Sequence, residues 1–145
     1  MIIGVPKEIK NNENRVAAIS ATVQELASRG HTILVQKGAG DGSGIGDKAF
    51  ESAGARIVPT ARQVFKGAEL ILKVKEPLPP EYPLLRPGQI LFTYLHLAAD
   101  KGLTEALLAQ RIVGIAYETI ETTDGRLPLL EPMSEVAGRM AVHIA

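Results

Sequence analysis

The sequence contains no cysteine, no excess of charge of either sign and no long apolar run. The absence of cysteine excludes disulfide bridges and thiolate metal sites. Sixteen basic residues balance sixteen acidic ones, so the charge does not indicate binding to nucleic acid or to an anionic membrane surface. No apolar segment approaches the ~18 residues of a membrane-spanning helix, and the opening residues lack the apolar core of a signal peptide. We therefore expect a cytoplasmic protein.

What is present is the composition of a folded globular domain. The 145 residues are 46% hydrophobic and 22% charged. This is ordinary for a soluble domain with a sizeable core, and it argues against disorder.

Short apolar runs alternate with segments of helical character. Strands are predicted at residues 2–5, 32–36, 55–58, 69–74, 89–94 and 111–118, and helices at 21–29, 47–53, 60–66 and 100–110. Ser20 and Asp47 are predicted helix caps, and Thr60 with Gln63 forms a predicted capping box. Unbroken apolar strands separated by helices are typical of a parallel sheet covered on both faces. Right-handed crossovers then give an open, doubly wound α/β domain with a mostly parallel sheet, of the Rossmann or flavodoxin type.

The segment KGAGDGSGIGD, residues 37–47, has the appearance of a nucleotide-binding loop. A dinucleotide fingerprint needs G-x-G-x-x-G, and no register of this segment supplies the third glycine. The P-loop pattern fails as well. Asp47 would also place a negative charge where a phosphate should bind. We interpret the segment as a surface loop and not as a nucleotide site.

Residues with reactive or charged side chains follow several predicted strands. Because ligands of open α/β sheets bind outside the carboxyl ends of the strands, this rim is the candidate site. It carries Arg15, Lys75, Tyr94, His96 and Glu118. Arginine can hold a carboxylate bidentately, a partly desolvated lysine can point at a substrate oxygen, and a histidine can transfer protons near neutral pH. Together they suggest a small carboxylic acid substrate and proton transfer beside a carbonyl or imine carbon.

Four of these residues also have a plain structural interpretation. Arg15 could pair with Glu13 or Glu8 on the surface. Lys75 could leave the sheet for water, as Lys73 could also do. The lone His96 could be satisfied by a backbone carbonyl, and Glu118 could be a polar residue of the rim. The remaining histidines, His31 and His143, are too scattered to form a zinc site.

Several motifs closely resemble the N-terminal part of bacterial alanine dehydrogenase. They are GVPKEIKNNENRVA at 4–17, HTILVQKGAGDGSGIGD at 31–47, ILKVKEP at 71–77, ILFTYLHLAA at 90–99, IAYETI at 115–120 and LPLLEPMSEVAGR at 127–139. The resemblance extends over the whole chain. The first domain of the proton-translocating NAD(P) transhydrogenase is a related alternative, but its pattern lacks the histidine of YLHLA.

The resemblance implies roles for individual residues. Arg15 matches the arginine that grips the carboxylate of pyruvate or alanine, and Lys75 the lysine that binds substrate oxygen atoms. His96 matches the catalytic acid/base. Tyr94 and Met133 are expected to line the substrate pocket.

The resemblance also implies cofactor contacts and a reaction. Ser134 is expected near the nucleotide, and Glu118 matches a position linked to a divalent metal cation in some members. The family reaction interconverts L-alanine, NAD and water with pyruvate, ammonium and NADH, and its members are commonly hexamers. The NAD cofactor is expected to be bound mainly by a domain that this chain lacks. That domain is also expected to carry a catalytic aspartate.

A domain division follows from the resemblance. Residues 1–132 are expected to form the substrate-binding domain, and 133–145 the start of an inter-domain helix. Met133, Val136, Met140 and Ile144 form an apolar stripe at helical spacing, without a stop signal. In the family a later segment completes the first domain. We therefore expect the isolated chain to be inactive and to expose an apolar patch.

Of two further alternatives, one stays open and the other is excluded by the sequence. A stand-alone, non-catalytic carboxylate-binding α/β module is compatible with the 145 residues. A signalling receiver is not, because it needs acidic residues after its first strand and after a middle strand. Here Pro6 and Lys7 follow the first strand, and Lys75 follows a middle one.

Overall fold

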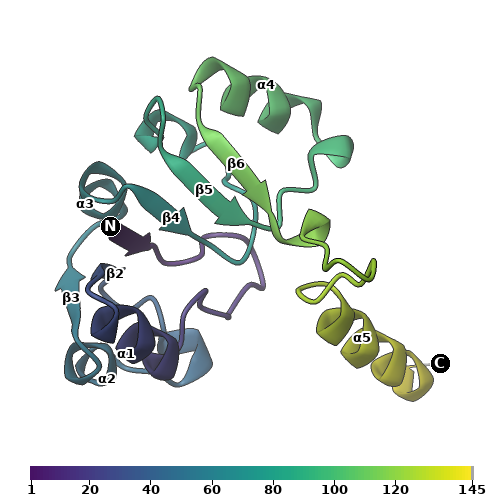
Figure 1. Cartoon of the computed structure of the whole chain (residues 1–145), viewed down its shortest axis with the longest axis horizontal. Helices are drawn as coiled ribbons and strands as arrows, with labels where there is room; N and C mark the ends of the chain where they lie inside the picture. The colour runs from purple at the N-terminus through teal and green to yellow at the C-terminus, as the bar shows by residue number, and fades with distance from the viewer. Residues whose placement is uncertain (145) are drawn as a thin grey trace.

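A six-stranded, wholly parallel sheet forms the centre of the protein, in a computed structural model that describes residues 1–144 and the side chains of residues 1–141 (Figure 1). Its strands are β1 (Ile2–Val5), β2 (Thr32–Gln36), β3 (Ala55–Val58), β4 (Leu70–Leu72), β5 (Ile90–Thr93) and β6 (Val113–Ala116). They are arranged in the order β3-β2-β1-β4-β5-β6. The predicted doubly wound α/β fold is confirmed, because this order winds outward in both directions from β1 and β4.

Helices connect the strands and cover them. They are α1 (Ser20–Ser28), α2 (Asp47–Ser52), α3 (Ala61–Gly67), α4 (Lys101–Ala109) and α5 (Glu131–Ile144), with 3-10 turns η1 (Asp41–Ser43), η2 (Tyr82–Leu84), η3 (Leu97–Ala99) and η4 (Tyr117–Thr119). The helix α5 projects away from the body of the sheet and its helices (Figure 1). Among the described residues, no helix has the length and apolar character needed to cross a membrane.

The helix starts follow the predictions only in part. The capping box of Thr60 and Gln63 at α3 is confirmed, with both reciprocal hydrogen bonds present. The predicted caps Ser20 and Asp47 are wrong. Each is the first residue of its helix, and the preceding residue occupies the cap position without a side-chain bond. The carboxylate of Asp47 instead accepts a hydrogen bond from the backbone N–H of Gly38, at 2.8 Å.

The two faces of the sheet have separate cores. On one face, α3 and α4 pack against Ile71 and Leu91, with Phe65 and Leu103 fully buried. On the other face, α1 and α2 cover Val5 and its neighbours in β1 and β2. Each core is built from alternate residues of the strands, because successive side chains of a strand point to opposite faces.

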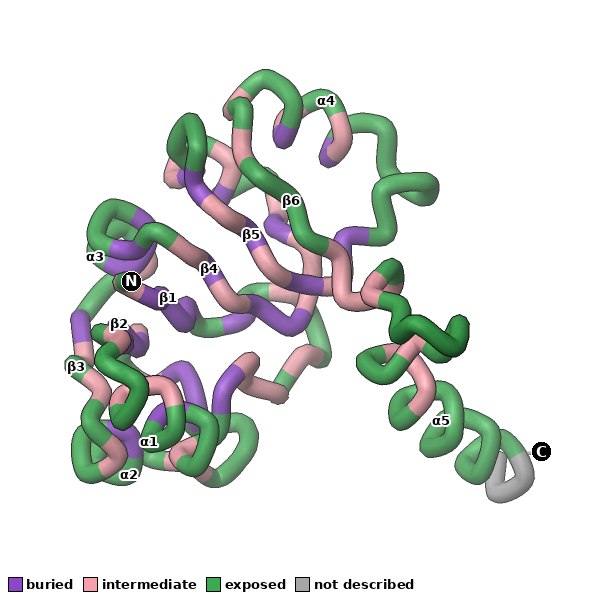
Figure 2. The backbone as a smooth tube through the Cα atoms, in the orientation of Figure 1, coloured by how far each residue is buried: buried purple, intermediate pink, exposed green. Residues whose placement is uncertain are grey.

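The face that bears α1 and α2 is left open over β4, β5 and β6. We call this region the uncovered face; its residues are Leu70, Leu72, Ile90, Phe92, Val113 and Ile115. Val113 is 50% exposed and Ile115 39% exposed. Figure 2 shows β1 largely buried and β6 largely exposed. The structure therefore has the exposed apolar patch that we expected.

Candidate functional site

The strand order reverses between β1 and β4, which pair directly at Gly4 and Ile71. The chain leaves the sheet in different directions after these two strands, and a crevice at their carboxyl ends is the usual ligand site of such sheets. The segment after β1 carries Arg15, and the segment after β4 carries Lys75. The candidate site is therefore built mainly from these two connections.

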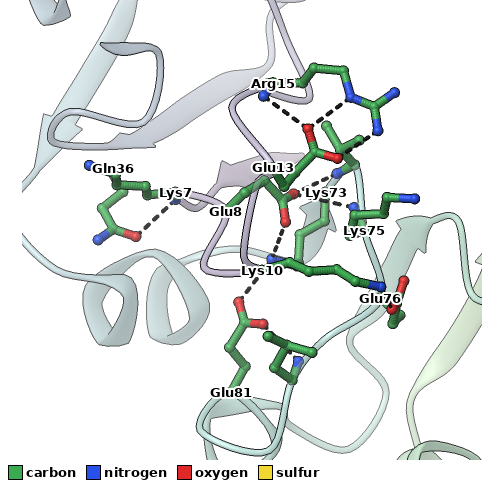
Figure 3. Close-up of polar contacts among 12 residues, drawn as sticks. Lys7, Glu8, Lys10, Glu13, Arg15, Gln36, Lys73, Lys75, Glu76 and Glu81 are labelled. Carbon is green, nitrogen blue, oxygen red and sulfur yellow. Dashed lines mark hydrogen bonds and ion pairs between the residues drawn. The ribbon is translucent and has the colours of Figure 1, made fainter. Parts of the chain in front are cut away.

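A buried ionic network joins the two connections (Figure 3). The side chain of Lys73 is fully buried, and its Nζ lies 3.0 Å from Glu8 Oε2 and 2.9 Å from Glu81 Oε1. The expectation that Lys73 could extend into water is wrong, because two carboxylates distant in sequence surround it. A lysine inside the apolar run ELILKV was the only sequence signal for this network, since a buried lysine requires partners.

The same network positions the backbone that precedes Lys75. Glu8 Oε1 accepts hydrogen bonds from the N–H of Val74, at 2.7 Å, and of Lys75, at 3.4 Å. Glu81 Oε2 accepts a hydrogen bond from Leu78 N–H, at 2.9 Å. Both carboxylates thus bind one ammonium and the backbone as well, which satisfies buried charges that would otherwise be costly. Sequence reasoning missed Glu8 and Glu81 as members of the site's framework.

Arg15 is held by Glu13 through two parallel hydrogen bonds. Arg15 Nε lies 2.8 Å from Glu13 Oε1, and Arg15 Nη2 lies 2.6 Å from Glu13 Oε2. The pairing with Glu13 that we kept as an alternative is present. It lowers the pKa of the Glu13 carboxyl, chiefly through the hydrogen bonds from Arg15. The outer edge of the guanidinium keeps further N–H donors, and Nη1 lies 3.6 Å from Met133 Sδ.

Lys75 is half-buried next to this pair. Among the described residues, no carboxylate lies within ion-pair distance of its ammonium. It is nevertheless close enough to Glu13 to help lower the pKa of that carboxyl. In Figure 3 the side chains of Arg15 and Lys75 extend from the network toward the same side of the view. Two cations are therefore available to an acidic ligand, one fixed by Glu13 and one unpaired.

The aromatic side chain of Tyr94 contacts His96 and Tyr117. The ring of Tyr94 stacks on the His96 imidazole with centroids 6.0 Å apart and an interplanar angle of 13°. Its edge contacts Tyr117, with centroids 5.0 Å apart, and its hydroxyl donates to the carbonyl oxygen of Leu129. Burial raises the pKa of Tyr117 well above its ordinary value, so that its hydroxyl stays protonated.

His96 has an unusual backbone conformation that Glu118 supports. Its φ of 48° and ψ of 37° lie in the left-handed region, which is uncommon for a residue with a side chain. The Glu118 carboxylate accepts hydrogen bonds from Leu95 N–H, at 3.0 Å, and from His96 N–H, at 2.7 Å. Among residues 1–141, no group of three His, Asp or Glu side chains could hold a metal ion. A metal cation at Glu118 therefore stays a prediction. In the structure, the Glu118 carboxylate fixes the His96 turn.

The predicted site residues line different hollows. Arg15 and Tyr94 line a cleft of about 690 Å³ whose other lining residues are mostly apolar, among them Leu26 of α1 and Phe92 of the uncovered face. His96 and Glu118 line a neighbouring hollow of about 400 Å³. Ser134 lies apart, exposed on α5. The structure links Arg15 with Met133 and Tyr94 with His96, and it does not bring Ser134 to them.

The glycine-rich loop does not have the geometry of a phosphate site. The N–H of Gly38, at its start, is already bound to the Asp47 carboxylate. Asp47 also places a negative charge in the first turn of α2, which disfavours an anion there. Both features are consistent with the interpretation of the segment as a surface loop.

An open, parallel sheet of six strands with helices on its faces places the chain in the class of doubly wound α/β domains, with two cations near its switch point. The chain belongs to the family described as Alanine dehydrogenase/PNT, N-terminal domain, which it matches over residues 4–137. This confirms the resemblance that the sequence motifs indicated.

Individual relatives agree with this assignment. The chain is 60% identical to alanine dehydrogenase of Mycolicibacterium smegmatis and 59% identical to that of Bacillus subtilis, over 99% of its own length. It spans 39% and 38% of the length of these two relatives. A solved structure named L-alanine dehydrogenase matches with a TM-score of 0.95 and 49% identity, over 99% of this chain and 40% of that one.

The match to a transhydrogenase is weaker. The crystal structure of transhydrogenase from Sinorhizobium meliloti gives a TM-score of 0.77 at 34% identity. It covers 81% of this chain and 34% of that one. Of the two kinds of protein considered from the sequence, the alanine dehydrogenase structure is therefore the more similar to this chain.

Proposed function

We propose that this chain supplies the substrate-binding and acid/base half of an NAD-dependent alanine dehydrogenase. The reaction is the reversible oxidative deamination of L-alanine to pyruvate and ammonium. The single observation that carries the proposal is the pairing of Arg15 with Glu13 beside the unpaired Lys75, at the switch point of the sheet. The named relatives support it, since they are alanine dehydrogenases and are similar to this chain over 99% of its length.

In this proposal the two cations bind and orient the acid. Glu13 holds the Arg15 guanidinium by Nε and Nη2, so its outer N–H groups are oriented for the substrate carboxylate before binding. Lys75 points its ammonium at the second oxygen function of the substrate, the keto oxygen of pyruvate. Fixing the acid at two points lowers the entropic cost of reaching the reactive orientation. Tyr94 and Met133 form the sides of the pocket next to the acid.

His96 is the proposed acid/base. A ring nitrogen of its imidazole holds or releases the proton that moves as the imine and carbinolamine interconvert with pyruvate. The stacked Tyr94 ring fixes the plane of the imidazole, and Glu118 fixes its backbone. Both contacts reduce the freedom of the group that must meet the substrate.

The residues of this chain do not fit the main site of a dinucleotide. The glycine-rich loop binds its own Asp47, and the G-x-G-x-x-G pattern is absent. When bound, NAD supplies the hydride acceptor. Of the residues described, we assign it only a contact with the exposed Ser134 on α5. We therefore assign α5 to the connection with an NAD-binding domain, and residues 1–132 to the substrate domain.

The cellular setting of the activity follows the same assignment. We propose a cytoplasmic enzyme that works as a homo-oligomer, with the hexamer as the expected form. Its ligands are the small molecules L-alanine and pyruvate, and no nucleic acid or membrane takes part. The measured mass of the full-length protein in solution tests the oligomeric state.

Titration with pyruvate tests the substrate site in the chain itself. We expect pyruvate to perturb the NMR signals of His96 and of the Arg15 backbone in the wild type, and to lose this effect in Arg15→Ala. The matched control is Arg29→Ala, which removes an exposed arginine whose partner is Glu25 in α1. Equal perturbation in the wild type and Arg15→Ala would contradict the substrate site.

Turnover tests the acid/base. In the full-length protein, His96→Ala is expected to lower NAD-dependent alanine oxidation by about 10²- to 10⁴-fold. His31→Asn serves as the control, because His31 precedes β2 at the opposite edge of the sheet. Turnover retained in His96→Ala would remove the catalytic role.

A further inference from the structure

The glycine-rich loop has no role in the proposed chemistry, yet one of its glycines touches the segment that carries Arg15. A Cβ atom added to Gly42 would lie 2.7 Å from the carbonyl oxygen of Asn14 and 3.0 Å from the Cα atom of Asn14. Side-chain carbons do not approach backbone atoms as closely as the first of these distances. Any residue other than glycine at position 42 must therefore displace Asn14, the neighbour of Arg15.

Space, and not backbone conformation, requires a glycine at this position. Gly38 and Gly44 of the same loop have φ angles of 70° and 72°, in the left-handed region where glycine is favoured. Gly42 is not among the glycines with positive φ. Its requirement comes only from the close approach to Asn14. The hydroxyl of Ser43 adds a hydrogen bond to the carbonyl oxygen of Asn14, at 3.0 Å.

The loop itself is anchored in the core. A Cβ on Gly40 would lie 2.4 Å from the carbonyl oxygen of Ile45 and 2.7 Å from the ring of Phe50, which is fully buried. The bond from Gly38 N–H to Asp47 closes the base of the loop. A loop held in this way resists displacement, so a clash at Gly42 moves the opposing segment.

The opposing segment has less support of its own. Residues 6–19 form no helix and no strand. Glu13 holds the guanidinium of Arg15, while Gly42 and Ser43 contact the backbone just before it. A small hollow of about 110 Å³ lies between the loop and this segment, with Asn14 and Arg15 among its lining residues.

We propose that Gly42 is a positioning residue, and that the glycine-rich loop supports the Arg15 segment through the contact of Gly42 and Ser43 with Asn14. This contact determines the position of the Arg15 guanidinium, and therefore the affinity for the small carboxylic acid. This inference rests on the proposed function, because it assumes that Arg15 binds the acid. The glycines of the loop thus serve a carboxylate site through packing and bind no phosphate.

The experiment compares Gly42→Ala with Gly46→Ala in the same loop. Gly46 has a φ of −77° and nothing within 4 Å of an added Cβ, so alanine fits there. Gly46 is also the N-cap residue of α2, where alanine is a poorer cap than glycine. The control therefore loses some stability without moving Asn14. Thermal unfolding of both variants places them on one stability scale.

Pyruvate binding is the main readout. We expect Gly42→Ala to bind pyruvate about tenfold or more weakly than the wild type, since small misplacements of a binding group have large effects. We expect Gly46→Ala to bind it as the wild type does. In the full-length enzyme, Gly42→Ala should raise KM for pyruvate and leave kcat nearly unchanged, the pattern for binding lost equally in ground and transition states. A general loss of folded protein would not give this split.

Ser43→Ala gives a second, milder test that keeps the fold. It removes only the exposed hydroxyl bond to Asn14, and we expect a loss of affinity smaller than that of Gly42→Ala. Wild-type affinity in a folded Gly42→Ala would overturn the proposal, as would equal losses in Gly42→Ala and Gly46→Ala. If Gly42→Ala does not fold, unchanged affinity in Ser43→Ala overturns it.

If the proposed function is wrong, the results differ from those expected if only the role of Gly42 is wrong. In that case the wild type does not bind pyruvate, or Arg15→Ala binds it equally well. The NMR signal of the Arg15 backbone N–H then still reports on the contact between the glycine-rich loop and the Arg15 segment without any ligand. It should shift in Gly42→Ala and stay in place in Gly46→Ala, and an unshifted signal in both variants would contradict the contact itself.

Discussion

The two faces of the same sheet differ sharply in how far they are closed. On the face of α3 and α4, Ile71 and Leu91 pair across β4 and β5 and are both fully buried. On the opposite face, burial decreases across the sheet from Ile3, which is 5% exposed, to Val113, which is 50% exposed. All-parallel sheets are normally covered on both faces. The difference teaches that β4 to β6 have the sequence of buried strands but a neighbour on one side only.

The largest expected effect comes from the closed face. Phe65→Ala removes a fully buried ring of α3 and should lower the free energy of unfolding by about 3–5 kcal/mol. Urea denaturation monitored by circular dichroism measures it. A loss below about 1 kcal/mol would show that this face tolerates a cavity and would remove the contrast with the uncovered face.

The buried network is expected to come next. Lys73→Met keeps the volume of the side chain but leaves the carboxylates of Glu8 and Glu81 buried without their cation. We expect a loss of about 3 kcal/mol, because an unpaired buried charge is the costly state. Adding Glu8→Gln and Glu81→Gln to Lys73→Met should recover part of it, as measured in urea. No recovery would mean that Lys73 acts by packing and not by charge.

A smaller effect on the free energy of unfolding is expected from the pair of Glu13 and Arg15 as the pH falls. The hydrogen bonds from Arg15 lower the pKa of the Glu13 carboxyl below its ordinary value of 4.5. Glu13 therefore stabilises the folded state fully above that value and loses this contribution as the pH falls through its lowered folded pKa. The difference in stability between the wild type and Glu13→Gln should be constant near neutral pH and shrink in the acid range. A difference that does not change with pH would contradict the pairing.

The smallest effect is expected on the uncovered face. Ile115→Thr replaces a side chain that is already 39% exposed, so the free energy of unfolding should change by less than about 0.5 kcal/mol. Binding of an apolar dye such as ANS should decrease, because the patch becomes more polar. A loss as large as that of Phe65→Ala would mean that this face is covered in solution.

Much of the fold could be predicted from local patterns. Each strand was found as an apolar run, and the capping box at Thr60 was read from two residues three positions apart. The errors lie at the ends of elements. The strand predicted at 111–118 is only Val113–Ala116, because Arg111 takes a left-handed φ of 52° and Tyr117 begins a 3-10 turn. Such ends depend on contacts that lie outside the segment.

The residues of the candidate site could be nominated from the sequence, and their roles stay predictions, but the framework that holds them could not be foreseen. Position after a strand was enough to select Arg15 and Lys75, since the carboxyl ends of parallel strands share one edge. It was not enough to show that Glu8, 65 residues before Lys73, binds that lysine and the backbone of Val74. The role of Glu118 at the His96 turn was hidden in the same way.

The sequence by itself determined the class of the fold and the family, and it showed that the glycine-rich loop lacks the G-x-G-x-x-G pattern. These rest on local periodicity and on motifs whose spacing can be read along one chain. Only the tertiary structure decided which carboxylates surround Lys73, which face of β4 to β6 stays open, and that Gly42 lies against Asn14. The physical reason is that electrostatic pairing and close packing act between groups that are near in space, and chain separation carries little information about that distance.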